Sequence, residues 1–350
     1  MFKKQFFLKI VPIGIMIAFL SMAQFKIFYK NFDKYLVSHI EAAKGVVEGY
    51  PHWRIFQNRV TGPYAVEFTQ KVTGLSFPIS YLLTIFLWMM VFYSIMMVVS
   101  ISIRPSLIFA FGTSVGAAFF NSLLMYGLWL YTWDIIDLSI FTLFIWAIIK
   151  KKPIGYLVCI IVFETFNREV SLILSGWLLF DALVMILPSP NTGKFPIIAF
   201  KFNKKQFIVA LLLIAFVIFT VEYLRDTLLI RQIGPEFFRD YKGQGGLVMV
   251  QFWDNFDFLF FSFIEIKGLK SIYSLLNILL LGAGILGVFS RDRQVIRASV
   301  LYLVLWIFTL VFGVIYETRV WLSYVPFIAI VCPMILNDME ERLSDEKKDG

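Results

Sequence analysis

The sequence is poor in charge and in the residues that build common metal and disulfide sites. Only 16% of its 350 residues are Asp, Glu, Lys or Arg, too few to cover a soluble protein of this length. The two cysteines, Cys159 and Cys332, exclude a disulfide framework and a cysteine-rich metal site. His39 and His52 are the only histidines, so we expect no histidine-based zinc site.

Apolar residues dominate the composition. Hydrophobic side chains make up 59% of the chain, its mean hydropathy is +0.78, and 39 residues are Phe. We therefore predict an all-α protein that forms one integral membrane domain over residues 1–350, a polytopic bundle of about ten transmembrane helices. The predicted spans are 10–28, 78–101, 105–130, 136–149, 153–166, 170–188, 206–224, 270–289, 298–315 and 320–336. The fifth and sixth are short and abut, so they could form a re-entrant hairpin, which would leave eight crossings.

Basic residues are distributed unevenly among the connections between these spans. If the N-terminus is cytoplasmic, the internal connections hold Arg104, Lys150–Lys152, four lysines in 191–205 and three arginines in 290–297. The short external connections hold one basic residue each or none. The positive-inside rule then predicts that both termini are cytoplasmic, with 337–350 as a cytoplasmic tail.

The same bias explains the net charge of +8, and we predict no nucleic-acid partner. The basic start and apolar run of the N-terminus also fit a cleaved secretory signal. In either case the segment that follows lies outside the cytoplasm.

Two long external loops follow from this topology, residues 29–77 and 225–269. The first has a helical pattern that ends at Gly45 or Gly49, and a second amphipathic helix is expected after Gly62. Both helices would lie at the membrane surface. The second loop contains an apolar segment with interspersed acids, which is typical of an interfacial helix.

Charged residues gather at the external ends of the predicted helices. They are Asp33, Asp134, Asp137, Arg168, Glu169, Glu317 and Arg319. Each has a structural alternative, because Asp134 is well placed to cap a helix and the Arg–Glu neighbours could pin helix ends together. Asp137 lies deeper and is harder to explain by capping.

Several segments resemble a known superfamily of membrane enzymes. Residues 31–54, NFDKYLVSHIEAAKGVVEGYPHWR, look like the first external loop of the polyprenyl-phosphate-dependent glycosyltransferases of the GT-C superfamily. NRVTGPY at 58–64 looks like the Arg-x-x-x-Pro element of related bacterial membrane proteins. Three further segments resemble later elements of that group in the same order: WDIIDLSIFTLFIW, FNREVSLIL and ETRVWLSYVPFIAIV.

The resemblance implies transfer of a hexose or pentose from a polyprenyl-phosphate donor to a glycan, lipid or protein acceptor. Asp33 is then the candidate catalytic base, since a carboxylate can take the proton of the acceptor. Arginine suits the departing phosphate, and the candidates are Arg54, Arg59, Arg168 and Arg319. Asp137, Glu169 and Glu317 are further candidates for substrate binding, and a role of the two glutamates in holding a divalent cation stays open.

The resemblance also places the protein in a bacterial inner membrane, in contact with membrane lipids, and predicts no cofactor with certainty. Two other classes fit the sequence. One is a transporter or flippase of a lipid-linked glycan, which would need charges at both mouths of a path. The other is a non-catalytic membrane scaffold subunit that binds a partner.

Overall fold

The computed structural model describes residues 2–49, 59–125, 130–188, 196–224, 252–264, 269–313, 315 and 318–349. Most of these residues are helical. The α-helices are α1 Phe2–Phe32, α2 Leu36–Val47, α3 Thr61–Thr73, α4 Phe77–Ile103, α5 Leu107–Leu124, α6 Thr132–Ile149, α7 Ile154–Thr165, α8 Ser171–Leu183, α9 Lys204–Tyr223, α10 Phe252–Ile264, α11 Leu269–Val288, α12 Arg293–Phe312 and α13 Cys332–Asp349.

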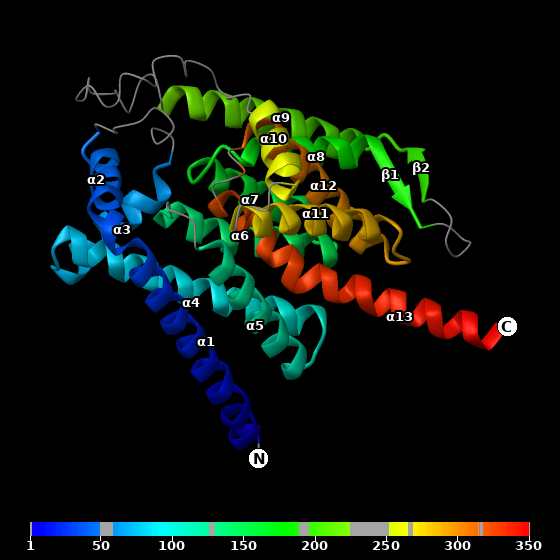
Figure 1. Cartoon of the computed structure of the whole chain (residues 1–350), viewed down its shortest axis with the longest axis horizontal. Coiled ribbons are helices and arrows are strands. Elements are labelled where there is room, and N and C mark those ends of the chain that lie inside the picture. Colours follow the sequence, from blue (N-terminus) through cyan, green and yellow to red (C-terminus); the bar gives the residue numbers. More distant parts are fainter. Residues whose placement is uncertain are drawn as a thin grey trace.

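The long helices run between two ends of the molecule. In Figure 1, α2 and α3 lie at the upper left, whereas the C-terminus and the small β1–β2 sheet lie at the right. We call the first the motif end, because Arg59, Asp134 and Arg168 lie there, and the second the hairpin end.

Within the described ranges, seven helical segments are long and apolar enough to cross a membrane, which indicates an integral membrane protein. They are Val11–Val47, Phe77–Ile103, Leu107–Leu124, Thr132–Ile149, Lys204–Tyr223, Arg293–Phe312 and Val320–Arg342. Three shorter apolar helices lie at Ile154–Thr165, Ser171–Leu183 and Ser274–Val288. Together they fall at the ten places where the sequence predicts spans.

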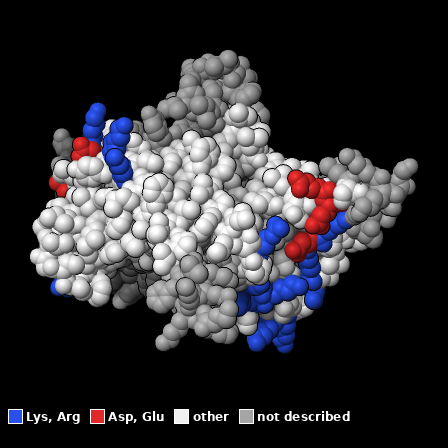
Figure 2. Space-filling view, turned by 90° about the horizontal axis from the view of Figure 1, so that it is seen from below, with Lys and Arg blue, Asp and Glu red and all other residues white. Residues whose placement is uncertain are grey.

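The surface carries the charge pattern of such a protein. Figure 2 shows Lys, Arg, Asp and Glu side chains at the two ends of one face and a broad uncharged area between them. Large apolar side chains are exposed on several of the long helices, among them Phe19 of α1, Val98 of α4 and Phe219 of α9. In a soluble protein such surfaces would be buried, whereas lipid accommodates them.

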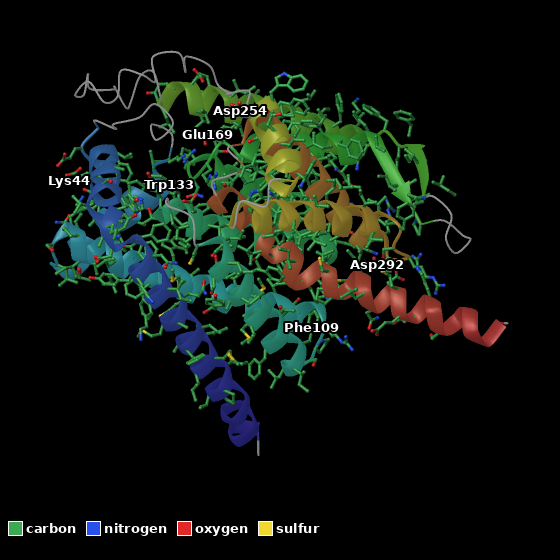
Figure 3. The ribbon with its side chains drawn as sticks, in the orientation of Figure 1. Lys44, Phe109, Trp133, Glu169, Asp254 and Asp292 are labelled. Atoms are coloured by element: carbon green, nitrogen blue, oxygen red, sulfur yellow. The ribbon has the colours of Figure 1, made fainter. Side chains whose placement is uncertain are left out.

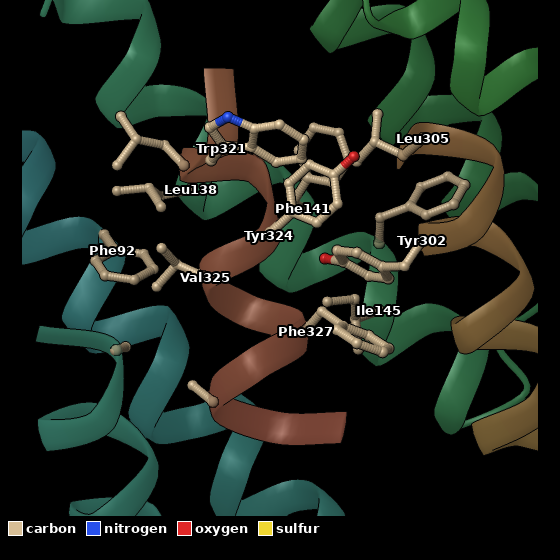
Figure 4. Close-up of a cluster of buried hydrophobic side chains, with 14 of the residues drawn as sticks. Phe92, Leu138, Phe141, Ile145, Tyr302, Leu305, Trp321, Tyr324, Val325 and Phe327 are labelled. Carbon is tan, nitrogen blue, oxygen red and sulfur yellow. The ribbon is translucent and has the colours of Figure 1, made fainter. Parts of the chain in front are cut away.

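Helix α6 is the centre of the bundle. Of its apolar 18-residue stretch, 83% is buried inside the protein, compared with 22–61% for the other long helices. Figure 4 shows buried side chains of α6 packed against those of α4, α12 and the segment after residue 318. The rings of Tyr302 and Phe327, for example, stack with their centroids 4.0 Å apart. Side chains at the start of α6 are therefore buried by the neighbouring segments.

The last predicted span, 320–336, is not one regular helix. A 3₁₀ helix, Thr318–Tyr324, is followed by a π-helical turn, Phe327–Val331, and then by α13. The 3₁₀ helix packs against α6, and the indole N–H of Trp321 donates to the carbonyl of Ile315 at 3.1 Å.

The all-α prediction is wrong over one short region. Helix α8 ends at Leu183, and the chain continues as β1, Val184–Leu187, which pairs antiparallel with β2, Ile197–Phe200. The predicted span 170–188 included β1. Both strands are rich in β-branched residues, and the sequence between them, PSPNTGKFP, contains three prolines, an Asn and a Gly, as is typical of a turn. A four-residue apolar run fits a helix or a strand equally well.

The two predicted helices of loop 29–77 are present as α2 and α3. Helix α2 ends at Val47, next to the predicted Gly49, which has a φ of +79°. Helix α3 packs along α4, and Thr84 Oγ1 donates to Thr69 Oγ1 at 2.9 Å across that contact.

The segment predicted as an interfacial helix in loop 225–269 contains α10, which packs on α11 and α12. The buried side chain of Asn255 in α10 donates to the carbonyls of Leu310 at 2.7 Å and Gly313 at 2.6 Å. Its Oδ1 accepts from the N–H of Ile315 at 3.2 Å. Asn255 thus supplies hydrogen bonds to carbonyls at the C-terminal end of α12, which have no partner within the helix.

Candidate functional site

The first turns of α6 carry two of the acids that the sequence predicts at the motif end. The backbone N–H of Tyr131 donates to Asp134 Oδ2 at 2.9 Å, so Asp134 supports the start of the helix. Asp134 and Asp137 are both fully buried. The helix N-terminus favours negative charge there, but a second buried carboxylate one turn further needs a positive partner.

Arg168, in the turn between α7 and α8, is that partner. Its Nη1 lies 3.2 Å from Asp134 Oδ1 and 2.5 Å from Asp137 Oδ2. Burial lowers the pKa of the Arg168 guanidinium, but the carboxylates of Asp137 and Asp134 outweigh burial and raise that pKa above its ordinary value. Arg168 therefore stays charged and joins two acids through one nitrogen.

Asn167 completes the contact between the α7–α8 turn and α6. Its Nδ2 lies 2.6 Å from Asp137 Oδ1, 3.1 Å from the carbonyl of Trp133 and 3.3 Å from Glu164 Oε2. Asn167 and Glu164 are both fully buried. The sequence reasoning assigned neither residue a role, although Asn167 stands inside the FNREV segment.

A second ion pair binds the first loop to the same turn. Arg59 Nη2 lies 3.4 Å from Glu169 Oε2, and the Arg59 guanidinium carbon lies 5.6 Å from the centroid of the Trp133 ring. The N–H groups of Val60 and Thr61 both donate to the carbonyl of Phe166, at 2.9 and 3.1 Å. Figure 3 shows Trp133 and Glu169 in this part of the molecule, away from Phe109 and Asp292.

Gly62 allows this close approach. A Cβ at position 62 would collide with the side chain of Thr132 and meet the backbone nitrogen of Trp133 at 3.0 Å. The backbone of α3 and the start of α6 are thus closer than any residue with a side chain permits.

An aromatic stack lines the side of the site that faces α2. The rings of Tyr131 and Trp133 are nearly parallel, with centroids 4.4 Å apart, and His39 of α2 lies 4.6 Å from Tyr131. Phe32, at the end of α1, lies 5.8 Å from His39. These rings fix the junction of α1 and α2 to the start of α6.

The predicted catalytic base lies next to this stack but outside the ion-pair cluster. Asp33 follows Phe32 directly and its side chain is exposed. The structure thus brings Arg59, Asp137, Arg168 and Glu169 together in one cluster, in which Asp137 is fully buried and Glu169 partly exposed, and leaves Asp33 at the surface of the same end. Arg54, Glu317 and the side chain of Arg319 lie outside the described residues.

In the described part of the chain, no group of three or more His, Cys, Asp or Glu side chains is arranged to hold a metal ion. No protein-family model, curated protein or solved structure matches the chain. Function must therefore be argued from the geometry and from the motifs themselves.

Proposed function

We propose that the chain is a membrane glycosyltransferase that moves a sugar from a polyprenyl-phosphate donor to an acceptor on the extracytoplasmic side. The observation that carries the proposal is the meeting of three motif segments, around Arg59, Asp137 and Arg168, which lie far apart in the sequence. These segments are the ones that resemble GT-C enzymes. Their contact at one end of the bundle is what a shared site requires.

Under this proposal all ten apolar helices cross a bacterial inner membrane and both termini are cytoplasmic. The motif end then faces the periplasm. The asymmetry of basic residues supports this orientation, because Lys150, Lys151 and Lys152 lie at the opposite end, where Lys150 Nζ donates to the carbonyl of Ser102 at 2.8 Å.

The residues divide into two groups by exposure. Asp33 is exposed and is the proposed general base for the acceptor, since it is accessible to a substrate that arrives from water. Arg59 is the proposed partner of the departing phosphate, because a guanidinium suits a phosphate and the carboxylate that it contacts, Glu169, is partly exposed. The ion pair of Arg168 with Asp137 holds the turn after α7, which lies beside Arg59, against α6.

The bundle interior favours this function over transport. Between the ion pairs of the motif end and the Asp181–Arg297 pair of the hairpin end, the described core around α6 is built mainly of aromatic and aliphatic side chains (Figure 4). A flippase needs polar groups along a path through the protein. The described charges instead gather at the two ends.

The test is an assay of the purified full-length protein with a panel of radiolabelled polyprenyl-phosphate sugars and a mixture of cell-envelope acceptors. We expect the wild type to release free lipid phosphate from one donor, and Asp33→Asn to abolish release while the protein stays folded and binds donor. Glu340→Gln, which changes an exposed acid of α13 in the same way, is the matched control and keeps full activity.

Two results would contradict the proposal. One is a wild type that turns over none of the donors, and the other is an Asp33→Asn variant as active as the control. If the wild type instead moves a lipid-linked glycan between the leaflets of a vesicle, the flippase is the better answer.

A further inference from the structure

Among the described residues of the motif end, three buried carboxylates lie around the guanidinium of Arg168. Asp134, Asp137 and Glu164 are each fully buried, and Arg168 contacts the first two. If all three acids were ionised, the positive charge of Arg168 would face three buried negative charges. Burying an unneutralised charge costs much free energy, so we expect one of these acids to be protonated.

The hydrogen bonds distinguish the three acids. Asp134 accepts from the backbone N–H of Tyr131 and from Arg168. Asp137 accepts from Arg168 and, at 2.6 Å, from Asn167. Both are therefore solvated by strong donors, as ionised carboxylates require.

Glu164 has no such support. Its Oε1 has no hydrogen-bond partner among the described residues, and its Oε2 faces only Asn167 Nδ2, at 3.3 Å. The Asn167 amide carries two hydrogens but faces three acceptors, and Glu164 is the most distant of the three. The Glu164 carboxyl nevertheless lies beside that of Asp137, because both face the same nitrogen, Asn167 Nδ2.

A proton on Glu164 resolves these contacts at once. The protonated acid has an O–H to donate, and the Asp137 carboxylate beside it can accept. The cluster then keeps two ionised acids, which Arg168, the amide of Asn167 and the N-terminus of α6 stabilise together.

We propose that Glu164 is a neutral carboxylic acid that donates a hydrogen bond to Asp137 and so holds that carboxylate against Arg168. Glu164 is thus a positioning residue, and its role does not depend on the reaction that the protein carries out. Gln reproduces the shape and the donor of the protonated acid, whereas Ala removes both.

The direct test is the infrared spectrum of the purified full-length protein with isotope-labelled glutamate, in detergent at neutral pH. We expect a label-sensitive C=O band of a protonated carboxyl group in the wild type, and loss of that band in Glu164→Gln. A wild-type spectrum that shows only ionised glutamate overturns the proposal.

Thermal unfolding of the variants gives a second readout that needs no substrate. Glu164→Gln is expected to unfold at the wild-type temperature, whereas Glu164→Ala and Asn167→Ala unfold at lower temperatures. Equal losses in Glu164→Gln and Glu164→Ala would show that the native group is charged and would overturn the proposal. Both readouts stay valid if the protein proves not to transfer sugars, so failure here and failure of the glycosyltransferase proposal can be told apart.

Discussion

The two ends of the molecule each hold a semi-buried arginine, but the arginines are paired in opposite ways. At the hairpin end, Arg297 forms a two-pronged contact with one carboxylate, with Nε and Nη2 each 2.7 Å from the oxygens of Asp181. Gln206 adds a donor to Asp181 at 2.8 Å, and Arg297 lies 5.6 Å from the Trp177 ring. Here one positive charge pairs with one negative charge, and both oxygens of the carboxylate accept hydrogen bonds.

At the motif end, one nitrogen of Arg168 serves two carboxylates while a third acid lies beside them. The hairpin-end pair is what a structural link between α8 and α12 needs. The motif end has more buried carboxyl groups than the one arginine there can neutralise. An excess of buried carboxyl groups lowers the stability of the fold, and such groups cluster at functional sites.

The largest effect is expected from removing each arginine in turn. Arg168→Ala leaves two buried carboxylates without a counter-charge and should lower the free energy of unfolding by about 3–5 kcal/mol. Arg297→Ala leaves one partly exposed carboxylate that still accepts from Gln206, and should lower it by about 1–2 kcal/mol. Denaturant titration in mixed micelles, followed by tryptophan fluorescence, measures both. Equal losses would remove the distinction between the two ends.

An intermediate effect is expected at the close approach of α3 and α6. Gly62→Ala forces a methyl group against Thr132 and should lower the free energy of unfolding by about 1–3 kcal/mol. Gly112→Ala in α5 is the matched control, because nothing lies within 4 Å of its added Cβ. It should be neutral or stabilising by at most about 1 kcal/mol. A silent Gly62→Ala would mean that the two backbones have room to separate.

The smallest effect concerns the ion pair between the first loop and the α7–α8 turn. Arg59→Gln loses the contact with Glu169 and the stacking on Trp133, which together contribute about 1 kcal/mol. Lys71→Gln, in the exposed Lys71–Glu67 pair of α3, should change stability by less than about 0.5 kcal/mol. The same titration compares the two. A larger loss for Lys71→Gln would contradict the importance of the Arg59 contact.

Bilayer-length apolar runs are a strong signal, and seven of the ten predicted spans fall on helices long and apolar enough to cross a membrane. The other three fall on shorter apolar helices, and their crossing stays a prediction. The sequence does not predict β1 and β2, since a short apolar run has no period of its own. Contacts between distant segments, such as Arg59 with Glu169, were expected as a group from the shared end of the helices. The partners within that group were not, because no local pattern specifies which acid an arginine meets.

Asn167 and Glu164 were missed for a related reason. Their importance comes from the burial of the first turns of α6, and burial of this kind is decided by packing between helices. The exposure of Asp33 is a packing result as well. It leaves the predicted base at the rim of the cluster, and its catalytic role stays a prediction.

The β1–β2 hairpin places an unusual surface at the far end of the bundle. Phe200 is 91% exposed and Phe202 63% exposed, and Lys201, Lys204 and Lys205 stand among and just after them. Exposed aromatic rings pack among acyl chains, and neighbouring ammonium groups bind lipid phosphates. Residues of these two kinds together favour the membrane–water interface. We therefore expect the end of β2 and the residues just after it to lie at the boundary between lipid and water.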